Sequence, residues 1–246
     1  MKRLILAALL AIVSSAPQAA DIVVLSSTAL KSSLEELGPR FEKTSGYKVV
    51  MKFGPAAELK KRIEGNENYD IAILTIPLMD DLAKASLIAV ESRFNVVKAG
   101  VGVAFKQGAP KPDIATADAF KRAMLAAKSV AYVGTGASSS VVRGAFERLG
   151  IADEMKAKTK LLSGVGAAEA VAKGEAELGF TQISEILGIA GAELAGPLPP
   201  EVQVYTVFTA AGNASAPSPL ASVAFLQYLR SAEAVKVIRS KGLEPG

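Results

Sequence analysis

Cysteine and histidine are both absent from this sequence of 246 residues. Without them the chain cannot form a Ser-His-Asp triad, a thiolate nucleophile or a common zinc site. Any catalysis would depend on carboxylates, lysines, tyrosines or hydroxyls, and we expect neither a metal ion nor a cofactor. The lack of cysteine also argues against a lipid-anchored lipoprotein, while a chain of this length buries a core without disulfides.

A strong excess of either charge is also missing. The sequence has 28 Lys and Arg against 24 Asp and Glu, and removal of residues 1–20 would leave 26 basic residues, a net charge of +2. A nucleic-acid-binding protein would concentrate basic residues on one face. We therefore expect no nucleic-acid partner.

Long apolar runs are confined to the N-terminus. Residues 1–20 have the pattern of a secretory signal, with Lys2 and Arg3 before an apolar run over 4–13 that is too short to span a bilayer. Small residues follow, and we expect cleavage near Ala19 or Ala20. The prediction is a soluble mature protein exported to the periplasm.

The remaining chain alternates between strand and helix patterns. Period-two or continuous apolar patterns predict strands at 21–27, 47–54, 70–75, 96–105, 129–134, 160–162, 177–182 and 202–210. Apolar residues at helical spacing predict helices at 30–41, from 55, from 77, and at 116–127, 138–149 and 165–173, then from 218 and from 232. The Pro-rich segment 196–201 is expected to break the chain before its last strand.

This order predicts an α/β protein of two doubly wound lobes joined by two crossover strands, 96–105 and 202–210. We expect a first lobe formed by 21–97 and 205–246, and a second lobe formed by 98–204. A cleft would lie between them, with hinge bending about the crossover strands.

Four turns could supply ligand contacts, because ligands of open α/β sheets bind beyond the carboxyl ends of strands, at helix N-termini. They are LSSTAL (25–30), FGPAAEL (53–59), VGTGASSSVV (133–142) and SGVGAAEAV (163–171). Each presents backbone N–H groups and the positive end of a helix dipole. Brought together, they would form an anion site.

Each candidate residue in these turns has a structural alternative. Ser27 and Thr28 could contact a ligand or only cap the following helix. Three serines, Ser138, Ser139 and Ser140, exceed what one cap requires, which favours a ligand role. Arg143 could hold an anion bidentately or lie on a solvated helix face.

Three further residues stand at strand ends or on the last crossover strand. Gln182 could donate to a ligand or only close its strand, and Tyr205 could point its hydroxyl into the cleft or pack in the core. Glu185 would be a base if it were buried, but we expect an exposed helix residue. The run 60–62 is expected to be a solvated helix face.

Together these segments resemble the molybdate-binding-like branch of the periplasmic solute-binding proteins. The resemblance covers nearly the whole mature chain and rests on DIVVLSSTALKSSLEELGPRFEKTSGYKV (21–49), FGPAAELKKRIE (53–64), YDIAILT (69–75), GTGASSSVVRGAFERLGI (134–151) and GEAELGFTQISEIL (174–187). It implies two α/β lobes that close on a ligand and deliver it to an ABC permease in the inner membrane. We expect a monomer.

The resemblance also implies a set of site residues. The first-turn hydroxyl position corresponds to Ala29, beside Ser27 and Thr28, and the second turn carries Pro55 and Ala56 in place of serine. Ser138 and Val165 match two helix N-termini of the second lobe, and Tyr205 matches a tyrosine on the returning strand.

Proline has no N–H, and the missing serines remove further donors, so this set favours an organic carboxylate over a molybdate-like oxyanion. An alternative within the same branch is a cofactor-independent tricarboxylate isomerase resembling aconitate isomerase. Its base would be a carboxylate such as Glu58 or Glu185, a lysine or a hydroxyl.

Overall fold

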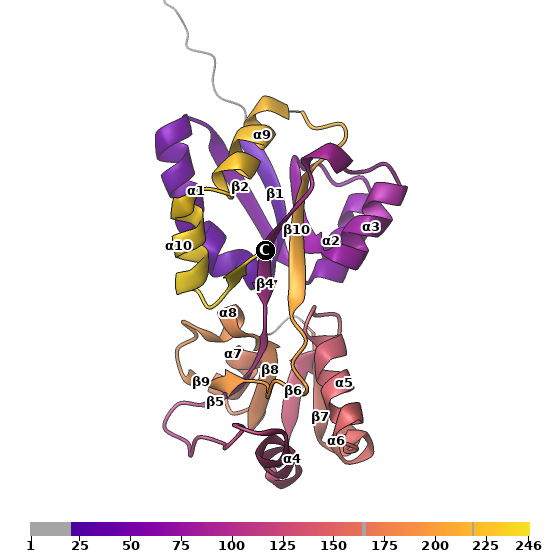
Figure 1. Cartoon of the computed structure of the whole chain (residues 1–246), viewed down its shortest axis with the longest axis vertical. Coiled ribbons are helices and arrows are strands. Elements are labelled where there is room, and N and C mark those ends of the chain that lie inside the picture. Colours follow the sequence, from indigo (N-terminus) through magenta and orange to yellow (C-terminus); the bar gives the residue numbers. More distant parts are fainter. Residues whose placement is uncertain (1–20, 164–165, 218) are drawn as a thin grey trace, which may run out of the picture.

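The computed structural model describes residues 21–163, 166–217 and 219–246. They form two lobes stacked along the long axis of the molecule, each built on one sheet (Figure 1). The predicted signal segment, 1–20, lies outside the described residues, as does Val165. The α/β class and the two-lobe arrangement expected from the sequence are confirmed.

The first lobe contains a six-stranded mixed sheet in the order β11-β4-β10-β3-β1-β2. Strand β1 lies between β2 and β3 and is parallel to both, whereas β10 is antiparallel to both β3 and β4. The strands are β1 (Asp21–Ser27), β2 (Lys48–Gly54), β3 (Ile71–Thr75), β4 (Phe94–Ala99), β10 (Thr206–Gly212) and β11 (Glu244–Pro245).

Helices cover both faces of this sheet (Figure 1). One face packs against α1 (Lys31–Ser45), α9 (Pro219–Tyr228) and α10 (Ala232–Ser240), and the other against α2 (Ala56–Glu64) and α3 (Ile76–Lys84). Short 3-10 turns, η1 (Thr28–Leu30) and η2 (Val90–Ser92), follow β1 and precede β4. Helix α1 buries Leu34, Leu37 and Phe41, as their spacing predicts.

The second lobe contains a five-stranded sheet in the order β7-β6-β8-β5-β9. Its strands are β5 (Val101–Lys106), β6 (Val130–Val133), β7 (Thr159–Leu162), β8 (Leu178–Gln182) and β9 (Ala192–Pro197). The helices are α4 (Ala117–Ala126), α5 (Ser139–Arg148), α6 (Ala152–Lys158), α7 (Ala167–Ala172) and α8 (Ile183–Ile186). Phe120, Phe146 and Phe180 form the centre of the core beneath α4, α5 and α6.

The predicted continuous strand over 96–105 is wrong. The chain leaves the first sheet after β4 and enters the second with β5, and Gly100 separates the two strands. A β-carbon on Gly100 would lie 3.3 Å from Gln203 Nε2 and 3.4 Å from Tyr205 Cε1, because the second crossing segment packs directly against it.

The second crossing also differs from its predicted strand over 202–210, since β10 begins only at Thr206. Before β10, the side chain of Gln203 makes hydrogen bonds with the Val101 backbone of the kind that a neighbouring strand would make. Its Oε1 accepts from the Val101 amide at 3.1 Å, and its Nε2 donates to the Val101 carbonyl at 2.8 Å. The two crossing segments are therefore joined side by side at the point where the chain passes between lobes.

Three elements of the second lobe are outside the predicted ranges, namely α6, α8 and β9. Strand β9 runs to Pro197, inside the segment expected to break the chain. Proline is tolerated there because β9 is the edge strand of its sheet and its N–H side needs no partner. Within the described residues, no helix is long and apolar enough to cross a membrane.

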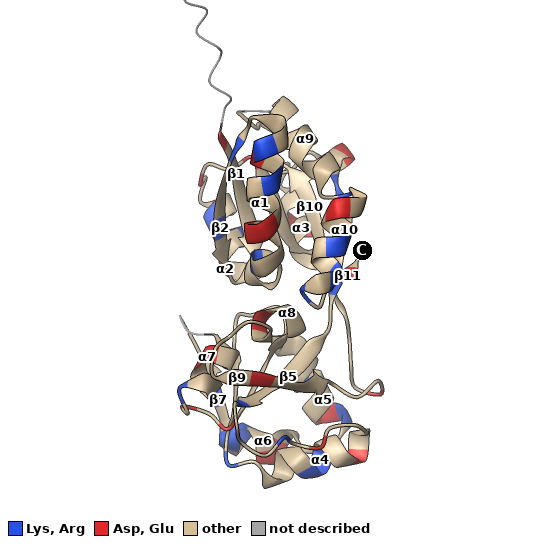
Figure 2. Cartoon of the chain, turned by 90° about the vertical axis from the view of Figure 1, so that its left-hand side faces the viewer, with Lys and Arg blue, Asp and Glu red and all other residues tan. Residues whose placement is uncertain are grey.

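Basic and acidic side chains are interspersed over α1 and α10 on the face shown in Figure 2. Arg40 of α1, for example, lies 2.5 Å from Glu36 and 3.0 Å from Glu233 of α10. Such mixing agrees with the small net charge of the sequence.

Candidate functional site

The predicted turns lie where the two lobes meet, and four contacts join them across the junction. Ala137 of the third turn packs against the core of the first lobe. Thr135 Oγ1 donates to Glu58 Oε1 of α2 at 3.2 Å. On α8, Ser184 donates to the Ala29 carbonyl and Glu185 bonds to the Thr28 side chain. The structure thus brings first-lobe and second-lobe turns together at one place.

The first turn follows β1 and is held by its own hydroxyls. Ser27 is buried, and its Oγ accepts from the Ala29 amide at 3.4 Å, so it caps η1. Ser26 donates to the Ser27 carbonyl at 3.2 Å. The structural alternative therefore holds for Ser27, while the Thr28 hydroxyl is directed at α8.

The second turn follows β2 and carries no hydroxyl. Pro55 is the N-cap of α2, and its carbonyl accepts from the amides of Glu58 and Leu59. Ala56 is buried beneath the turn. The first amides of α2 have no partner within the helix, so this turn can offer backbone N–H groups and an apolar surface.

The third turn connects β6 to α5 and bears the three serines. Ser138 and Ser139 are buried, whereas Ser140 is exposed. Ser138 is the N-cap of α5, but its hydroxyl makes no capping hydrogen bond. A β-carbon on Gly136 would lie 3.1 Å from the Val133 carbonyl, so a side chain there would crowd this tight turn. Ser138 is thus a buried serine at the start of a ten-residue helix, and its hydroxyl is not used in capping.

Arg143 is exposed, but its guanidinium turns back toward the turn. Its Nη1 donates to Ser139 Oγ at 2.5 Å. The arginine therefore lies on the solvated helix face, one of its two predicted readings, and it also fixes one serine of the turn.

The fourth turn leads from β7 into α7. Val165 lies outside the described residues, but Gly166 is the N-cap of α7. The Glu169 carboxylate folds back over Gly166, so that a β-carbon there would lie 2.0 Å from Glu169 Oε2. An acidic side chain thus lies at the start of α7, where the helix dipole favours negative charge.

The expectation that Glu185 is an exposed helix residue is wrong. It is partly buried at the junction, where its carboxylate accepts from the Thr181 hydroxyl, and the Thr28 side chain and the Gln182 backbone also act on it electrostatically. Burial raises the pKa of Glu185, the hydrogen bonds from Thr181 and Thr28 oppose that rise, and the nearby charge of Glu169 adds to it. The Gln182 contact also makes Glu185 part of a capping arrangement at α8.

Gln182 and Tyr205 lie at the crossing segments. Gln182 is buried; in the amide orientation that satisfies both of its ends, its nitrogen donates to the carbonyls of Ala99 (3.3 Å) and Gly100 (3.2 Å). Tyr205 is 50% exposed and its ring packs against Gly100, so it is not a core residue. Both residues therefore lie against the first crossing segment, at Ala99 and Gly100.

Three junction residues were missed in the sequence, namely Thr135, Thr181 and Ser184. Thr181 and Ser184 flank Gln182 at the end of β8, a position where ligand contacts are expected in open α/β sheets. That position was the available signal. Within the described part of the chain, no group of three or more acidic side chains is placed to hold a metal ion.

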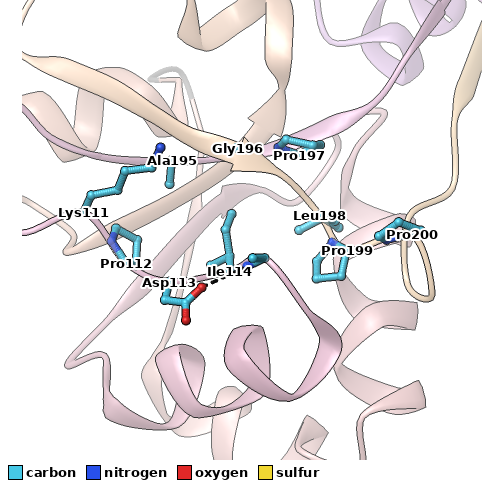
Figure 3. Close-up of a pocket in the computed structure, with 11 residues that line it drawn as sticks. Lys111, Pro112, Asp113, Ile114, Ala195, Gly196, Pro197, Leu198, Pro199 and Pro200 are labelled. Atoms are coloured by element: carbon cyan, nitrogen blue, oxygen red, sulfur yellow. Dashed lines mark hydrogen bonds between the residues drawn. The ribbon is translucent and has the colours of Figure 1, made fainter.

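A hollow of about 450 Å³ lies elsewhere, in the second lobe between the loop before α4 and the end of β9 (Figure 3). Prolines form much of its wall, and its aspartate, Asp113, already accepts from the Ala115 amide at 3.1 Å. It contains none of the predicted site residues.

Comparison with known proteins agrees with this geometry. Residues 22–244 match the family model described as bacterial extracellular solute-binding protein. Aconitate isomerase from Pseudomonas sp. is 32% identical over 229 residues, covering 91% of this chain and 87% of that protein. The molybdate-binding protein ModA from Azotobacter vinelandii is 26% identical over 261 residues, covering 98% of this chain and 97% of that protein.

Among solved structures, the periplasmic molybdate-binding protein of Azotobacter vinelandii superposes with a TM-score of 0.80 at 19% identity, covering 92% of this chain and 99% of that chain. This likeness concerns the fold. The family model covers nearly the whole chain, and it agrees with the two-lobed architecture. The chain belongs to the bacterial extracellular solute-binding proteins, in their molybdate-binding-like type.

Proposed function

We propose that this protein captures a small organic carboxylate between its two lobes in the periplasm and delivers it, as a monomer, to an ABC permease of the inner membrane. The observation that carries the proposal is the meeting of donor-bearing turns from both lobes. Ser138 at the start of α5, the amides that open α2, and the Thr28 hydroxyl all lie at this junction.

The chemistry of the junction favours a carboxylate over a tetrahedral oxyanion. An oxyanion needs many donors in a small shell, but Pro55 has no N–H and the second turn carries no hydroxyl. Pro55 is partly exposed and offers apolar surface instead, whereas Ala56 is buried. A carbon skeleton could rest against Pro55, with its charged end at Ser138 and Ser139.

A thermal-shift screen of residues 21–246 tests the proposal. The panel contains molybdate, tungstate, sulfate and phosphate on one side, and di- and tricarboxylates, including both aconitate isomers, on the other. Specific binding raises the melting temperature by mass action. We expect a shift with carboxylates; a shift with molybdate and tungstate alone would contradict the carboxylate assignment.

A second candidate is a cofactor-independent isomerase that moves a proton within an unsaturated tricarboxylate. Glu185 favours it, because a pure binding protein needs no titratable side chain at its site. The relative that is 32% identical is named as an aconitate isomerase. In such a step a base takes a proton from a saturated carbon beside the double bond, the double bond moves by one position, and the proton returns at the far carbon.

The isomerase is tested by incubating the protein separately with cis- and trans-aconitate and following both isomers by proton NMR. Enzyme-dependent approach to one equilibrium mixture from both sides would identify the isomerase. Binding of aconitate without conversion of one isomer into the other would argue against the isomerase and favour the carrier function. Glu185→Gln should abolish conversion if Glu185 moves the proton.

A further inference from the structure

The contacts between the lobes form two groups, one on each side of the chain crossings (Figure 1). One group is made by α8, which lies beneath the turn between α10 and β11. The other is made by the third turn, which precedes α5 and reaches toward α2. The two groups differ in burial and in packing, and this difference bears on how the lobes can separate.

The contacts of α8 with the first lobe are buried and tightly packed. Ser184 donates to the Ala29 carbonyl at 2.7 Å, and both residues are buried. A β-carbon on Gly242, in the turn after α10, would lie 2.8 Å from Leu187 Cδ1 and 2.9 Å from Ile183 Cγ2. Both distances are shorter than the optimal separation of two carbon atoms. Helix α8 therefore fits against the first lobe because residue 242 has no side chain.

The same helix is also fixed to its own lobe. Ile186 is buried in a cluster with Ala104 and Ala168 of the second lobe. At the start of α8, the Ile183 amide donates to the carbonyl of Gly100, on the first crossing, at 3.0 Å. Since both lobes hold α8, a rotation of one lobe against the other keeps these contacts only if its axis passes through α8.

The turn that receives α8 is tied to the first lobe at both of its ends. Helix α10 precedes Gly242, and β11 follows it. Strand β11 pairs with β4, with Glu244 opposite Lys98, and the Gly246 amide donates to the Val96 carbonyl at 3.0 Å. The docking surface for α8 is thus anchored beside the first crossing.

On the other side of the junction the contacts are weaker. Thr135 donates to Glu58 Oε1 at 3.2 Å, and both residues are exposed. Ala137, which packs against the first-lobe core, is only partly buried. An exposed hydrogen bond can be replaced by hydrogen bonds to water, so its net contribution is small. This side can separate at a lower cost than the side of α8.

Resting on the function proposed above, we propose that α8 is a third, non-covalent hinge between the lobes. The lobes rotate about a line through α8 and the two crossings, and the cleft opens between α2 and the third turn, where Thr135 separates from Glu58. Gly242 is the positioning residue of this hinge, because it leaves the space in which α8 docks. A ligand enters on the α2 side while α8 keeps its contacts.

Distances between paired spin labels, measured by double electron–electron resonance, test the position of the axis. The sequence has no cysteine, so introduced cysteines carry the only labels. One pair joins α2 and α5, through Lys61→Cys and Glu147→Cys. The second pair joins the residues after α8 to the end of α10, through Ala190→Cys and Ser240→Cys. All four positions are exposed.

Each labelled protein is measured alone and with succinate, tricarballylate, trans-aconitate, sulfate or molybdate, and calorimetry reports which probe binds. With a bound probe, the distance between positions 61 and 147 should shorten, while that between 190 and 240 should stay the same. A change in the second distance, or no shortening of the first with a bound probe, would overturn the inference and leave capture of the anion intact. Absence of binding by every probe would overturn the proposed function itself.

The role of Gly242 is tested without a ligand, by comparing Gly242→Ala with Gly46→Ala. Both glycines follow a helix and have positive φ, +75° and +79°, so both substitutions carry the backbone cost of a side chain at positive φ. A β-carbon on Gly46 would meet nothing within 4 Å, whereas one on Gly242 would meet α8. The two variants therefore differ in the contact with α8.

Hydrogen exchange followed by mass spectrometry gives the result. Relative to β6 in the core of the second lobe, the amides of 183–187 should exchange faster in Gly242→Ala and at the wild-type rate in Gly46→Ala. Equal exchange of 183–187 in the two variants would overturn the inference. If Gly242→Ala does not fold, the two label distances still decide the position of the axis.

Discussion

Ser184 of α8 donates a 2.7 Å hydrogen bond to the carbonyl oxygen of Ala29, a residue 155 positions earlier in the chain and in the other lobe. Both residues are buried. Together with the contact between Glu185 and Thr28, this bond fixes one side of the junction. The lobes are therefore linked by side-chain contacts as well as by the two chain crossings.

Replacing Ser184 by alanine should lower the free energy of unfolding by about 1 kcal/mol, the typical value of one buried hydrogen bond. Urea denaturation followed by circular dichroism measures the change. Ser240→Ala is the matched control, because Ser240 donates to the Val237 carbonyl at 2.8 Å on an exposed helix surface. If the two substitutions lowered the free energy of unfolding equally, the hydrogen bond at the junction would contribute no more to stability than one on an exposed helix.

Ser138→Ala should weaken binding of the captured carboxylate about tenfold, because it removes a buried hydroxyl that makes no capping bond and costs one charge-assisted hydrogen bond. Ser140→Ala, in the same turn but exposed, should change affinity less than twofold. Calorimetric titration with the carboxylate found in the thermal screen measures both. A larger loss of affinity in Ser140→Ala than in Ser138→Ala would mean that the ligand binds at Ser140 and not at Ser138.

Gln203→Ala should destabilise the protein by about 1–2 kcal/mol, because it leaves the Val101 amide without its side-chain acceptor and removes one donor from the Val101 carbonyl. Gln227→Ala, on the exposed surface of α9, should be close to neutral. Hydrogen exchange can locate the effect. Faster exchange of the Val101 amide, without change in the centre of either sheet, is the expected signature.

Acidification should remove the contribution of Glu67 to stability. The hydrogen bonds from Arg62 and Lys52 lower the pKa of Glu67 from 4.5 to about 2. Since the pKa is lowered in the folded state, the stabilisation is present above pH 4.5 and is lost as the pH falls toward 2. With Arg62 and Lys52 each 39% exposed, solvent screening reduces it to about 1–2 kcal/mol.

Unfolding of Glu67→Gln by urea at pH 7 and pH 3 tests this expectation. The difference from the wild-type protein should be largest at pH 7 and shrink at pH 3. Glu64→Gln removes a more exposed carboxylate, which pairs with Lys60, and provides the control. A difference that does not change with pH would mean that Glu67 acts through packing.

Local patterns predicted most elements because their apolar spacing records which face is buried, as in α1 with Leu34, Leu37 and Phe41. The same patterns could not show that β4 and β5 belong to different sheets. Both strands are apolar and nearly continuous in sequence. Such an apolar pattern is the same whether the two strands belong to one sheet or to two different sheets. Gly100 was the only local sign, and a glycine within a strand pattern has several meanings.

The candidate site was predictable only in part. The turns could be located, since each follows a strand and opens a helix. Glu185 could not be placed, because its burial depends on Thr28, which comes from the other lobe. Contacts between residues so far apart in sequence leave no periodic signal, and this holds for the hydrogen bonds of Gln203 with Val101 and of Ser184 with Ala29.

The position of β10 in the first sheet determines the order in which the molecule can be completed. This strand lies between β3 and β4, yet it is formed by residues near the end of the chain. The sheet of the second lobe is formed by one continuous stretch, from β5 to β9, and can assemble first. During synthesis the first sheet cannot join β3 to β4 until residues 206–212 are available, so its completion depends on contacts between residues far apart in sequence.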